Sequence, residues 1–272
     1  MSREDDILKH FNNISRSYDI NNEKLYWQLS DKLLWNIIVD YIPKDKKFKF
    51  LDLGGGTGTW SKLILDNYPL SNGILVDYSD GMLKQATEKL GKYANRIEII
   101  NSDINNFTID EYFDFILNIY LLPFFTNTNY LIKFISDHLK QYGEVLSVAE
   151  NYYNGLALNI LKGNIENINE MERNKIGKLS EFVPELKFHT IEEISRLYIN
   201  NNIEVKNIYG FPIVSSIGYS ESLTSENNSI SKILSTNFDD IYKLETKYVK
   251  KKTLANRGKY ICVVGEKNEK ES

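Results

Sequence analysis

The segment of residues 50–60 constrains the fold of this chain more than any other part of the sequence. An apolar run ends there in Asp52, Gly54, Gly56 and Gly58 follow at alternate positions, and a helix-like segment then begins. A strand that leads through a glycine turn into a helix is how α/β proteins bring backbone close to a nucleotide-like ligand. Glycine can take a positive φ and leaves room where a Cβ would block a ligand, so the segment predicts a ligand-binding loop.

The spacing of the glycines separates two classes of nucleotide-binding protein. The pattern here is Asp-x-Gly-x-Gly-x-Gly, whereas dinucleotide-binding proteins use Gly-x-Gly-x-x-Gly. Counted from Gly54, the last glycine of the dinucleotide pattern falls on Thr59. A nicotinamide-dependent oxidoreductase is therefore an alternative that the loop itself disfavours.

Composition places the chain among globular proteins and narrows its partners. With 272 residues, of which 42% are hydrophobic and 26% charged, the chain can bury one sizeable α/β core. Its net charge of −4 argues against a nucleic-acid partner, because such proteins usually carry a basic surplus. The histidines show no ligand spacing, so no metal site is expected.

Localisation is a further expectation from the sequence. The single cysteine, Cys262, excludes an internal disulfide and fits a reducing compartment. Residues 1–10 are mostly polar and do not resemble a signal peptide. The most apolar run, Phe113 to Phe125, is too short to span a membrane. We therefore expect a cytoplasmic protein without a membrane partner, as a monomer or a homodimer.

Strand-like and helix-like segments alternate along the chain. Strands are expected at Phe48–Leu53, Gly73–Asp77, Arg96–Asn101, Phe113–Ile119, Glu144–Ala149, Ile203–Tyr209 and Lys259–Gly265. Helices are expected near Trp60–Asn67, Ser79–Leu90 and Asn129–Leu139. Continuous apolar strands separated by helices indicate a mainly parallel sheet that is covered on both faces. The expected fold class is α/β, with a Rossmann-like, seven-stranded, mostly parallel sheet.

The two ends of the chain are expected to frame this sheet. Residues 1–47 are predicted to form a helical N-terminal cover, in which Leu25–Tyr41 is an amphipathic helix and Asn12–Asn22 is turn-prone. The main domain is predicted at residues 48–272. Two insertions are predicted within it, near 151–189 and near 211–257. Long insertions at the carboxyl side of a sheet are suited to form an acceptor pocket or a lid.

Polar residues follow three further strands at their carboxyl ends, where open α/β sheets bind ligands. Asp77 lies 19 residues after Gly58, and a carboxylate there can accept hydrogen bonds from both hydroxyls of a ribose. Asp103 follows the third strand, and Asn118 lies at the end of the fourth. Their joint spacing favours one shared ligand site over a set of unrelated strand caps.

Taken together, these motifs resemble the class I S-adenosylmethionine-dependent methyltransferase family over roughly Phe48 to Ala149. Leu51-Asp52-Leu53-Gly54-Gly55-Gly56-Thr57-Gly58 is similar to the first motif of that family, and Asp77-Tyr78-Ser79-Asp80-Gly81-Met82-Leu83 is similar to the second. Tyr142-Gly143-Glu144-Val145-Leu146 resembles the segment that leads into the fifth strand. The stretch from Phe11 to Asp19 is similar to the entry segment of the ubiquinone and menaquinone C-methyltransferases, a group that the chain does not follow after residue 150.

The resemblance implies S-adenosyl-L-methionine as the cofactor and suggests which residues would hold its central part. Gly54, Gly56 and Gly58 would pass under the methionine and ribose. Asp77 would hold the ribose hydroxyls, and Tyr18 would close over the site from the front.

The resemblance also implies contacts at the two ends of the cofactor. Tyr78 or Met82 would pack against the adenine ring. Asp103 would accept a hydrogen bond from the adenine amine, with the backbone of Ile104 beside it. The main chain of Asn118 would meet the ammonium group.

Methyl transfer from a sulfonium is an in-line displacement that needs proximity, alignment and a desolvated nucleophile more than a strong base. Glu150 directly follows the fifth strand and is the first candidate for orienting or deprotonating an acceptor; Tyr120 and Tyr18 are the other catalytic candidates. We expect methylation on nitrogen or oxygen of a small molecule or short peptide, as in natural-product tailoring. A methyltransferase-like binding or scaffold protein is the alternative from another class, and the intact loop and Asp77 disfavour it.

Overall fold

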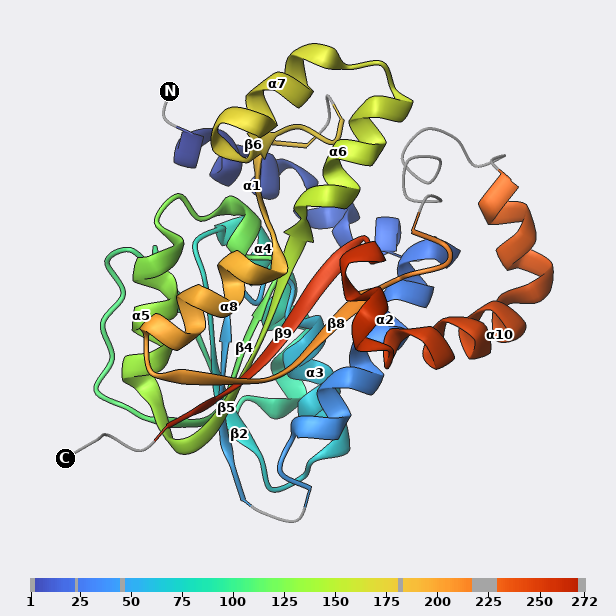
Figure 1. Cartoon of the computed structure of the whole chain (residues 1–272). Coiled ribbons are helices and arrows are strands. Elements are labelled where there is room, and N and C mark those ends of the chain that lie inside the picture. The colour runs from blue at the N-terminus through green and yellow to red at the C-terminus, as the bar shows by residue number, and fades with distance from the viewer. Residues whose placement is uncertain (1–2, 23, 45–46, 181–182, 217–228, 269–272) are drawn as a thin grey trace.

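The computed structural model describes residues 3–22, 24–44, 47–180, 183–216 and 229–268. The centre of this described part is a nine-stranded sheet with helices on both faces (Figure 1). Five parallel strands follow one another in the order β3-β2-β1-β4-β5. They span Lys49–Leu53 (β1), Asn72–Asp77 (β2), Ile97–Asn101 (β3), Phe113–Ile119 (β4) and Leu139–Asn151 (β5).

Two antiparallel strands and a short hairpin complete the sheet. β9 (Tyr260–Lys267) runs antiparallel to β5, and β8 (Ile203–Phe211) runs antiparallel to β9. The hairpin of β6 (Ile176–Gly177) and β7 (Leu186–His189) joins β5 at its carboxyl end. The predicted Rossmann-like α/β fold and its strands are therefore confirmed. The sheet has two strands more than predicted because the insertion after β5 contributes the hairpin, whose strands are too short to stand out in the sequence.

Helices cover both faces of the sheet, and a separate hydrophobic core lies between the sheet and the helices on each face. The helices span Arg3–Asn22 (α1), Leu25–Tyr41 (α2), Thr59–Asn67 (α3), Asp80–Leu90 (α4), Thr128–His138 (α5), Tyr152–Leu161 (α6), Ile165–Asn174 (α7), Ile191–Asn200 (α8) and Ser229–Val249 (α10). Adjacent residues of a strand point to opposite faces. Phe50 accordingly packs in the layer under α2, α3 and α4, whereas Leu51 packs in the layer under α5 and α8. No helix in the described part of the chain has the length and apolar character of a membrane span.

The N-terminal cover differs from the prediction in one respect. Asn12–Asn22 was predicted to be turn-prone, but it is the second half of the continuous helix α1. The polar side chains there, which favour turns in an isolated peptide, instead make contacts outside the helix: Asn12 with the start of α4 and Asp19 with the glycine loop. The prediction of helix at Leu25–Tyr41 is confirmed. Of the predicted insertion near 211–257, residues 217–228 lie outside the described residues.

A buried carboxylate attaches α10 to the sheet. Glu245 is fully buried, and its carboxylate accepts hydrogen bonds from the backbone N–H groups of Ile213 (2.7 Å), Val214 (2.9 Å) and Ser215 (2.7 Å). Since Glu245→Ala would leave these donors without their acceptor, we expect it to lower the free energy of unfolding by about 3 kcal/mol. Urea unfolding would measure this. Lys243→Ala, at an exposed site on the same helix, is the control, and equal stabilities of the two variants would contradict the prediction.

Candidate active site

The glycine loop between β1 and α3 takes the left-handed backbone conformation at alternate residues. The φ angles are +67° at Gly54, +55° at Gly56 and +77° at Gly58. A Cβ at Gly58 would lie 2.7 Å from Leu90 Cδ1, so this glycine allows α3 to pack closely on α4. A Cβ at Gly56 would meet no atom within 4 Å, because this residue borders open space. The loop therefore brings bare backbone to the edge of a cavity, as the sequence predicted.

The Asp77 carboxylate is held at the end of β2 by two backbone donors. Its Oδ2 accepts from the Gly56 N–H at 2.9 Å, and its Oδ1 accepts from the Ser79 N–H at 2.8 Å. Burial raises the pKa of Asp77, and these hydrogen bonds oppose the rise. Each oxygen keeps a lone pair beyond the one that its backbone donor uses. Asp77 can thus fix the shape of the loop and still accept from a ligand.

Helix α1 is attached across this loop. Near its middle, Asn12 Oδ1 accepts from the Ser79 hydroxyl at 2.8 Å and from the Gly81 N–H at 2.9 Å. Towards its C-terminus, Asp19 Oδ1 accepts from the Thr57 hydroxyl at 2.8 Å. These contacts place α1 over the start of α4 and over the glycine loop. Ser79 is also the N-cap of α4, since its hydroxyl accepts from the Met82 N–H.

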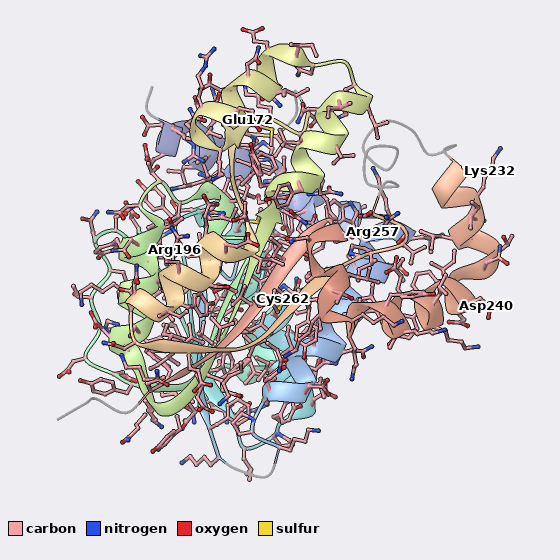
Figure 2. The ribbon with its side chains drawn as sticks, in the orientation of Figure 1. Glu172, Arg196, Lys232, Asp240, Arg257 and Cys262 are labelled. Atoms are coloured by element: carbon pink, nitrogen blue, oxygen red, sulfur yellow. The ribbon has the colours of Figure 1, made fainter. Side chains whose placement is uncertain are left out.

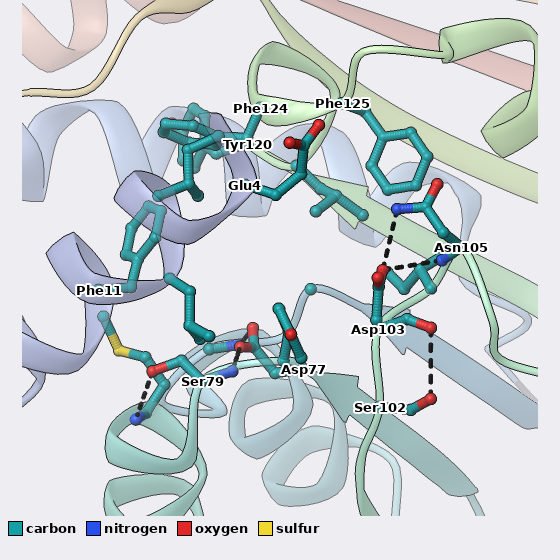
Figure 3. Close-up of a pocket in the computed structure, with 18 of the residues that line it drawn as sticks. Glu4, Phe11, Asp77, Ser79, Ser102, Asp103, Asn105, Tyr120, Phe124 and Phe125 are labelled. Carbon is teal, nitrogen blue, oxygen red and sulfur yellow. Dashed lines mark hydrogen bonds between the residues drawn. The ribbon is translucent and has the colours of Figure 1, made fainter. Parts of the chain in front are cut away.

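The first turn of α1 is attached to the far side of the same site. The Arg3 guanidinium donates to the carbonyl oxygens of Pro123, Phe124 and Glu185, at 3.0 to 3.2 Å. Figure 3 shows the resulting enclosure, with Phe11 of α1 facing Asp77 and Ser79 across a cavity. Helix α1 therefore forms a roof that is fixed at both of its ends and near its middle.

The cavity under this roof has a volume of about 240 Å³ and a mostly apolar, aromatic lining. Nine of the predicted site residues line it, namely Tyr18, Gly54, Gly56, Asp77, Tyr78, Met82, Asp103, Ile104 and Tyr120. Gly58, Asn118 and Glu150 are not in its lining. Sequence reasoning missed the aromatic side chains of Phe11, Phe124 and Phe125, which also line it. Phe11 belongs to the predicted entry segment. Its side chain faces the cavity because α1 is one continuous helix, which the sequence did not predict.

Asp103 follows β3 and Asn118 lies near the end of β4, two strands that β2 and β1 separate in the sheet, and the surroundings of the two residues differ. Asp103 Oδ1 accepts from the backbone and side-chain N–H groups of Asn105, both at 2.9 Å, and the residue borders the cavity. The Asn118 side chain is fully buried and donates to the Ser147 hydroxyl at 3.2 Å. Its Oδ1 is buried and has no hydrogen-bond partner among the described residues.

Tyr120 has both an unusual backbone and an unsatisfied hydroxyl. Its φ of +60° is rare for a residue with a large side chain. Its ring packs against Tyr260 with 4.8 Å between centroids, and its buried hydroxyl has no hydrogen-bond partner within the part of the chain that the structure describes. Burial, and then the nearby carboxylate of Asp31, raise the pKa of Tyr120 well above its ordinary value. A strained residue with an unused polar group beside a cavity is typical of a functional site.

Asp31 of α2 is a titratable group that sequence reasoning missed. Burial raises its pKa to about 7, so this carboxyl can gain or lose a proton near neutral pH. An acid between Ser30 and Lys32, on a helix whose other face is apolar, has the sequence appearance of a solvent-exposed residue. Its burial depends on the packing of α2 and was not visible in the helical pattern.

Glu150 lies in a buried ion pair with Lys259 instead of facing the cavity. The two residues are 7% and 1% exposed, and the Lys259 ammonium donates directly to Glu150 Oε2. Burial raises the pKa of Glu150, and the Lys259 ammonium opposes that rise. Glu150 pairs with Tyr260 across β5 and β9, so the partner lysine comes from the end of the chain. The described residues contain no group of three or more side chains suited to hold a metal ion.

Comparison with known proteins shows that the region of this site is similar to methyltransferases. A profile described as a methyltransferase domain matches residues 50–143, from β1 to the start of the apolar part of β5. Malonyl-[acyl-carrier protein] O-methyltransferase from Priestia megaterium is 25% identical over 70% of this chain and 65% of its own length. A second protein of that name, from Ilyobacter polytropus, is 28% identical over 53% of this chain and 48% of its own length. The chain thus spans about half to two thirds of these curated relatives.

Solved structures agree with this assignment at the level of the fold. A putative S-adenosylmethionine-dependent methyltransferase from Listeria monocytogenes superimposes with a TM-score of 0.63 and 13% identity, covering 89% of this chain and 100% of that protein. The profile match begins at the strand before the glycine loop and includes Asp77 and Asp103. The matched methyltransferase domain and the shared fold support a class I S-adenosylmethionine-dependent methyltransferase with S-adenosyl-L-methionine as its cofactor.

Proposed function

We propose that this protein transfers the methyl group of S-adenosyl-L-methionine to nitrogen or oxygen of a small acceptor, or of an acceptor carried on a peptide or protein. The observation that supports this best is the arrangement of Asp77 and Gly56. A half-buried carboxylate with spare lone pairs lies beside a glycine that borders open space, under an aromatic roof. Such a site suits a ribose and an adjoining flat ring.

We assign the parts of the cofactor to residues as the family resemblance implies. Asp77 accepts from the ribose hydroxyls, while Asp103 and Ile104 meet the adenine edge. Tyr78 and Met82 pack on the ring, and the main chain of Asn118 meets the ammonium. Gly54 and Gly56 admit the methionine part, and Gly58 supports them by its close packing on α4.

When bound, the cofactor supplies a methyl group on a cationic sulfonium that becomes a neutral thioether as the group leaves. The residues of this chain exclude water and align the acceptor. Aromatic side chains from α1 and from the segment after β4 shield the cavity, and aromatic faces tolerate a nearby cation. The unpartnered Tyr120 hydroxyl is placed to orient the acceptor atom. Tyr18, in the roof, restricts the direction of approach.

A hydroxyl or ammonium acceptor must also lose a proton. We assign its acceptance to Asp31, a carboxylate near Tyr120 that does not itself line the cavity, in preference to Glu150. A carboxylate with a pKa of about 7 is matched to this task, and Glu150 is already paired with Lys259. Two carboxylates, those of Asp31 and Glu150, therefore lie near Tyr120, and the Lys259 ammonium compensates the charge of Glu150. This surplus of negative charge favours a neutral hydroxyl or an amine.

Oxygen is the favoured acceptor atom, since the curated relatives are named O-methyltransferases. Their names give the substrate as a malonyl group on an acyl-carrier protein, and that group presents a carboxylate. A carboxylate is nucleophilic without a base. Malonyl-carrier methylation is therefore a second candidate, which the relatives support and the acidic surroundings of Tyr120 oppose.

Calorimetry and turnover test the proposal in sequence. We expect S-adenosylhomocysteine to bind and NADH not to bind, because Thr59 replaces the third glycine of the dinucleotide loop. We then expect radiolabelled methyl transfer to a member of a panel of alcohols, phenols, amines and malonyl-carrier protein. Absence of S-adenosylhomocysteine binding at millimolar concentration would refute the proposal. Tight NADH binding would favour an oxidoreductase, and cofactor binding without turnover on any acceptor would favour a binding protein.

A further inference from the structure

A second hollow lies beside the cofactor cavity, where α7, β7 and α8 contribute to its wall. It has a volume of about 410 Å³. Glu172 and Arg173 of α7, Lys187 and His189 of β7, and Arg196 of α8 contribute to its wall. Figure 2 labels Glu172 and Arg196, which belong to two of these elements. We call this hollow the basic groove.

The basic groove carries more positive than negative charge. Its lining holds four cationic side chains, from Arg173, Lys175, Lys187 and Arg196, and two carboxylates, from Glu172 and Glu193. The resulting surplus is positive, although the whole chain has a net charge of −4. A local surplus of this kind on an acidic protein attracts anions.

The two carboxylates of the groove already have partners. Glu193 pairs with Lys175, and Glu172 accepts from the Tyr152 hydroxyl. Arg196, in contrast, makes neither an ion pair nor a hydrogen bond through its side chain with any other residue that the structure describes. The nearest carboxylate to Arg173 is Glu170, at 3.7 Å on an exposed helix face. The guanidinium groups are therefore available to an external ligand.

His189 adds a buried polar group without a partner. The residue is 2% exposed, lines the groove, and has no hydrogen-bond partner for either ring nitrogen within the described ranges. Burial, and then the neighbouring Lys187 ammonium, lower its pKa to about 4, so the ring is neutral at pH 7. A buried imidazole with two unsatisfied nitrogens costs stability, which a ligand oxygen at the groove could recover.

We propose that the basic groove is a binding site for a phosphate group. A tetrahedral dianion can receive hydrogen bonds from several directions, and here the donors come from three elements: Arg173 on α7, Lys187 and His189 on β7, and Arg196 on α8. Guanidinium groups match phosphate oxygens in pairs, and charge-assisted hydrogen bonds are the stronger kind. A carboxylate would use fewer of these donors.

The groove adjoins the wall of the cofactor cavity. Lys187 Nζ donates to the carbonyl oxygen of Thr126 at 3.1 Å, and Thr126 lines the cavity. Asn127 lines the cavity and the next residue, Thr128, lines the groove. A phosphate in the groove could therefore belong to a distant end of an acceptor or to a free small anion. Both sources share the same recognition chemistry.

Histidine NMR gives a direct test, because the chain has three histidines. At neutral pH, titration with inorganic phosphate should move the His189 signal along a saturating curve and raise its pKa from about 4. His10 and His138 are internal controls that should not move. Lys187→Gln and Arg196→Gln should each weaken phosphate binding by about tenfold. Lys243→Gln, at an exposed and distant lysine, should leave it unchanged.

Either of two results would overturn the proposal. One is a His189 signal that does not respond to phosphate at about 10 mM, a concentration that would saturate even a weak site. The other is a response that Lys187→Gln, Arg196→Gln and Lys243→Gln alter equally, which would indicate general ionic strength. Neither measurement needs methyl transfer, so the test of the phosphate site is independent of the proposed activity.

Kinetics then identify the source of the phosphate. If the site holds a phosphate of the acceptor, inorganic phosphate should compete with the acceptor and raise its apparent KM. If the site holds a free anion, phosphate should bind with no change in that KM. Each result supports the groove as a phosphate site, and in the first case the Arg196→Gln variant should need about tenfold more phosphate for the same competition.

Discussion

Asp77→Ala should reduce the affinity for S-adenosylhomocysteine by at least about 100-fold. The substitution removes the acceptor for two ribose hydroxyls, and each charge-assisted hydrogen bond contributes roughly 1.5–3 kcal/mol. It also leaves the Gly56 N–H without its acceptor, which loosens the loop that borders the cavity. Isothermal titration calorimetry measures the affinity directly.

The matched control for this prediction lies on the next helix. Asp80→Ala removes an exposed carboxylate that accepts from the Asn101 side chain at 2.8 Å and does not line the cavity. We expect its affinity for S-adenosylhomocysteine to stay within about twofold of the wild-type value. An Asp77→Ala protein that remains folded by circular dichroism and binds as tightly as Asp80→Ala would refute the ribose role.

Lys259→Met should lower the free energy of unfolding by about 3–5 kcal/mol at neutral pH. The substitution leaves the Glu150 carboxylate buried between β5 and β9 without its counter-charge. The double variant with Glu150→Leu should recover most of this loss, because two apolar residues in place of a buried pair are often tolerated. Urea unfolding of the single and double variants gives the coupling free energy.

A direct catalytic role of Glu150 remains a prediction, and substitution of Glu150 and of Asp31 tests it. If Glu150 only balances Lys259, Glu150→Gln should reduce stability and change kcat little. Asp31→Asn should instead reduce kcat and remove the pH dependence near 7 that its raised pKa predicts. A large fall in kcat for Glu150→Gln at unchanged stability, with Asp31→Asn fully active, would reverse our assignment.

The parts of the site that local sequence determines were predictable. Gly54, Gly56 and Gly58 need a positive φ within one short loop, and Asp77 follows at the end of the next strand, so spacing alone located them. The N-cap at Ser79 is equally local, since its partner lies one helical turn away. For such features, the residue type and the position along the element carry the structural information.

The remainder depended on contacts between distant parts of the chain. The direction of Glu150 was not predictable because its partner Lys259 lies 109 residues later. The burial of Asp31 follows from how α2 packs, and a helical pattern marks a face without naming its neighbour. The second half of α1 was predicted to be turn-prone because its polar residues favour turns in an isolated peptide. In the structure, Asn12 contacts α4 and Asp19 contacts the glycine loop, and the segment is helical.

The attachment of α1 by Arg3 has a consequence for the order of folding. This guanidinium bonds to carbonyl oxygens that lie 120 and 182 residues further along the chain. Contacts with so large a separation require long loops to close, so they form late and are among the first to open. We therefore expect the central sheet to be complete before the roof is in place, with a ligand-binding edge that is transiently uncovered in every folding cycle. Helix α1 precedes the sheet in the sequence, yet it would thus be among the last elements to reach its final position.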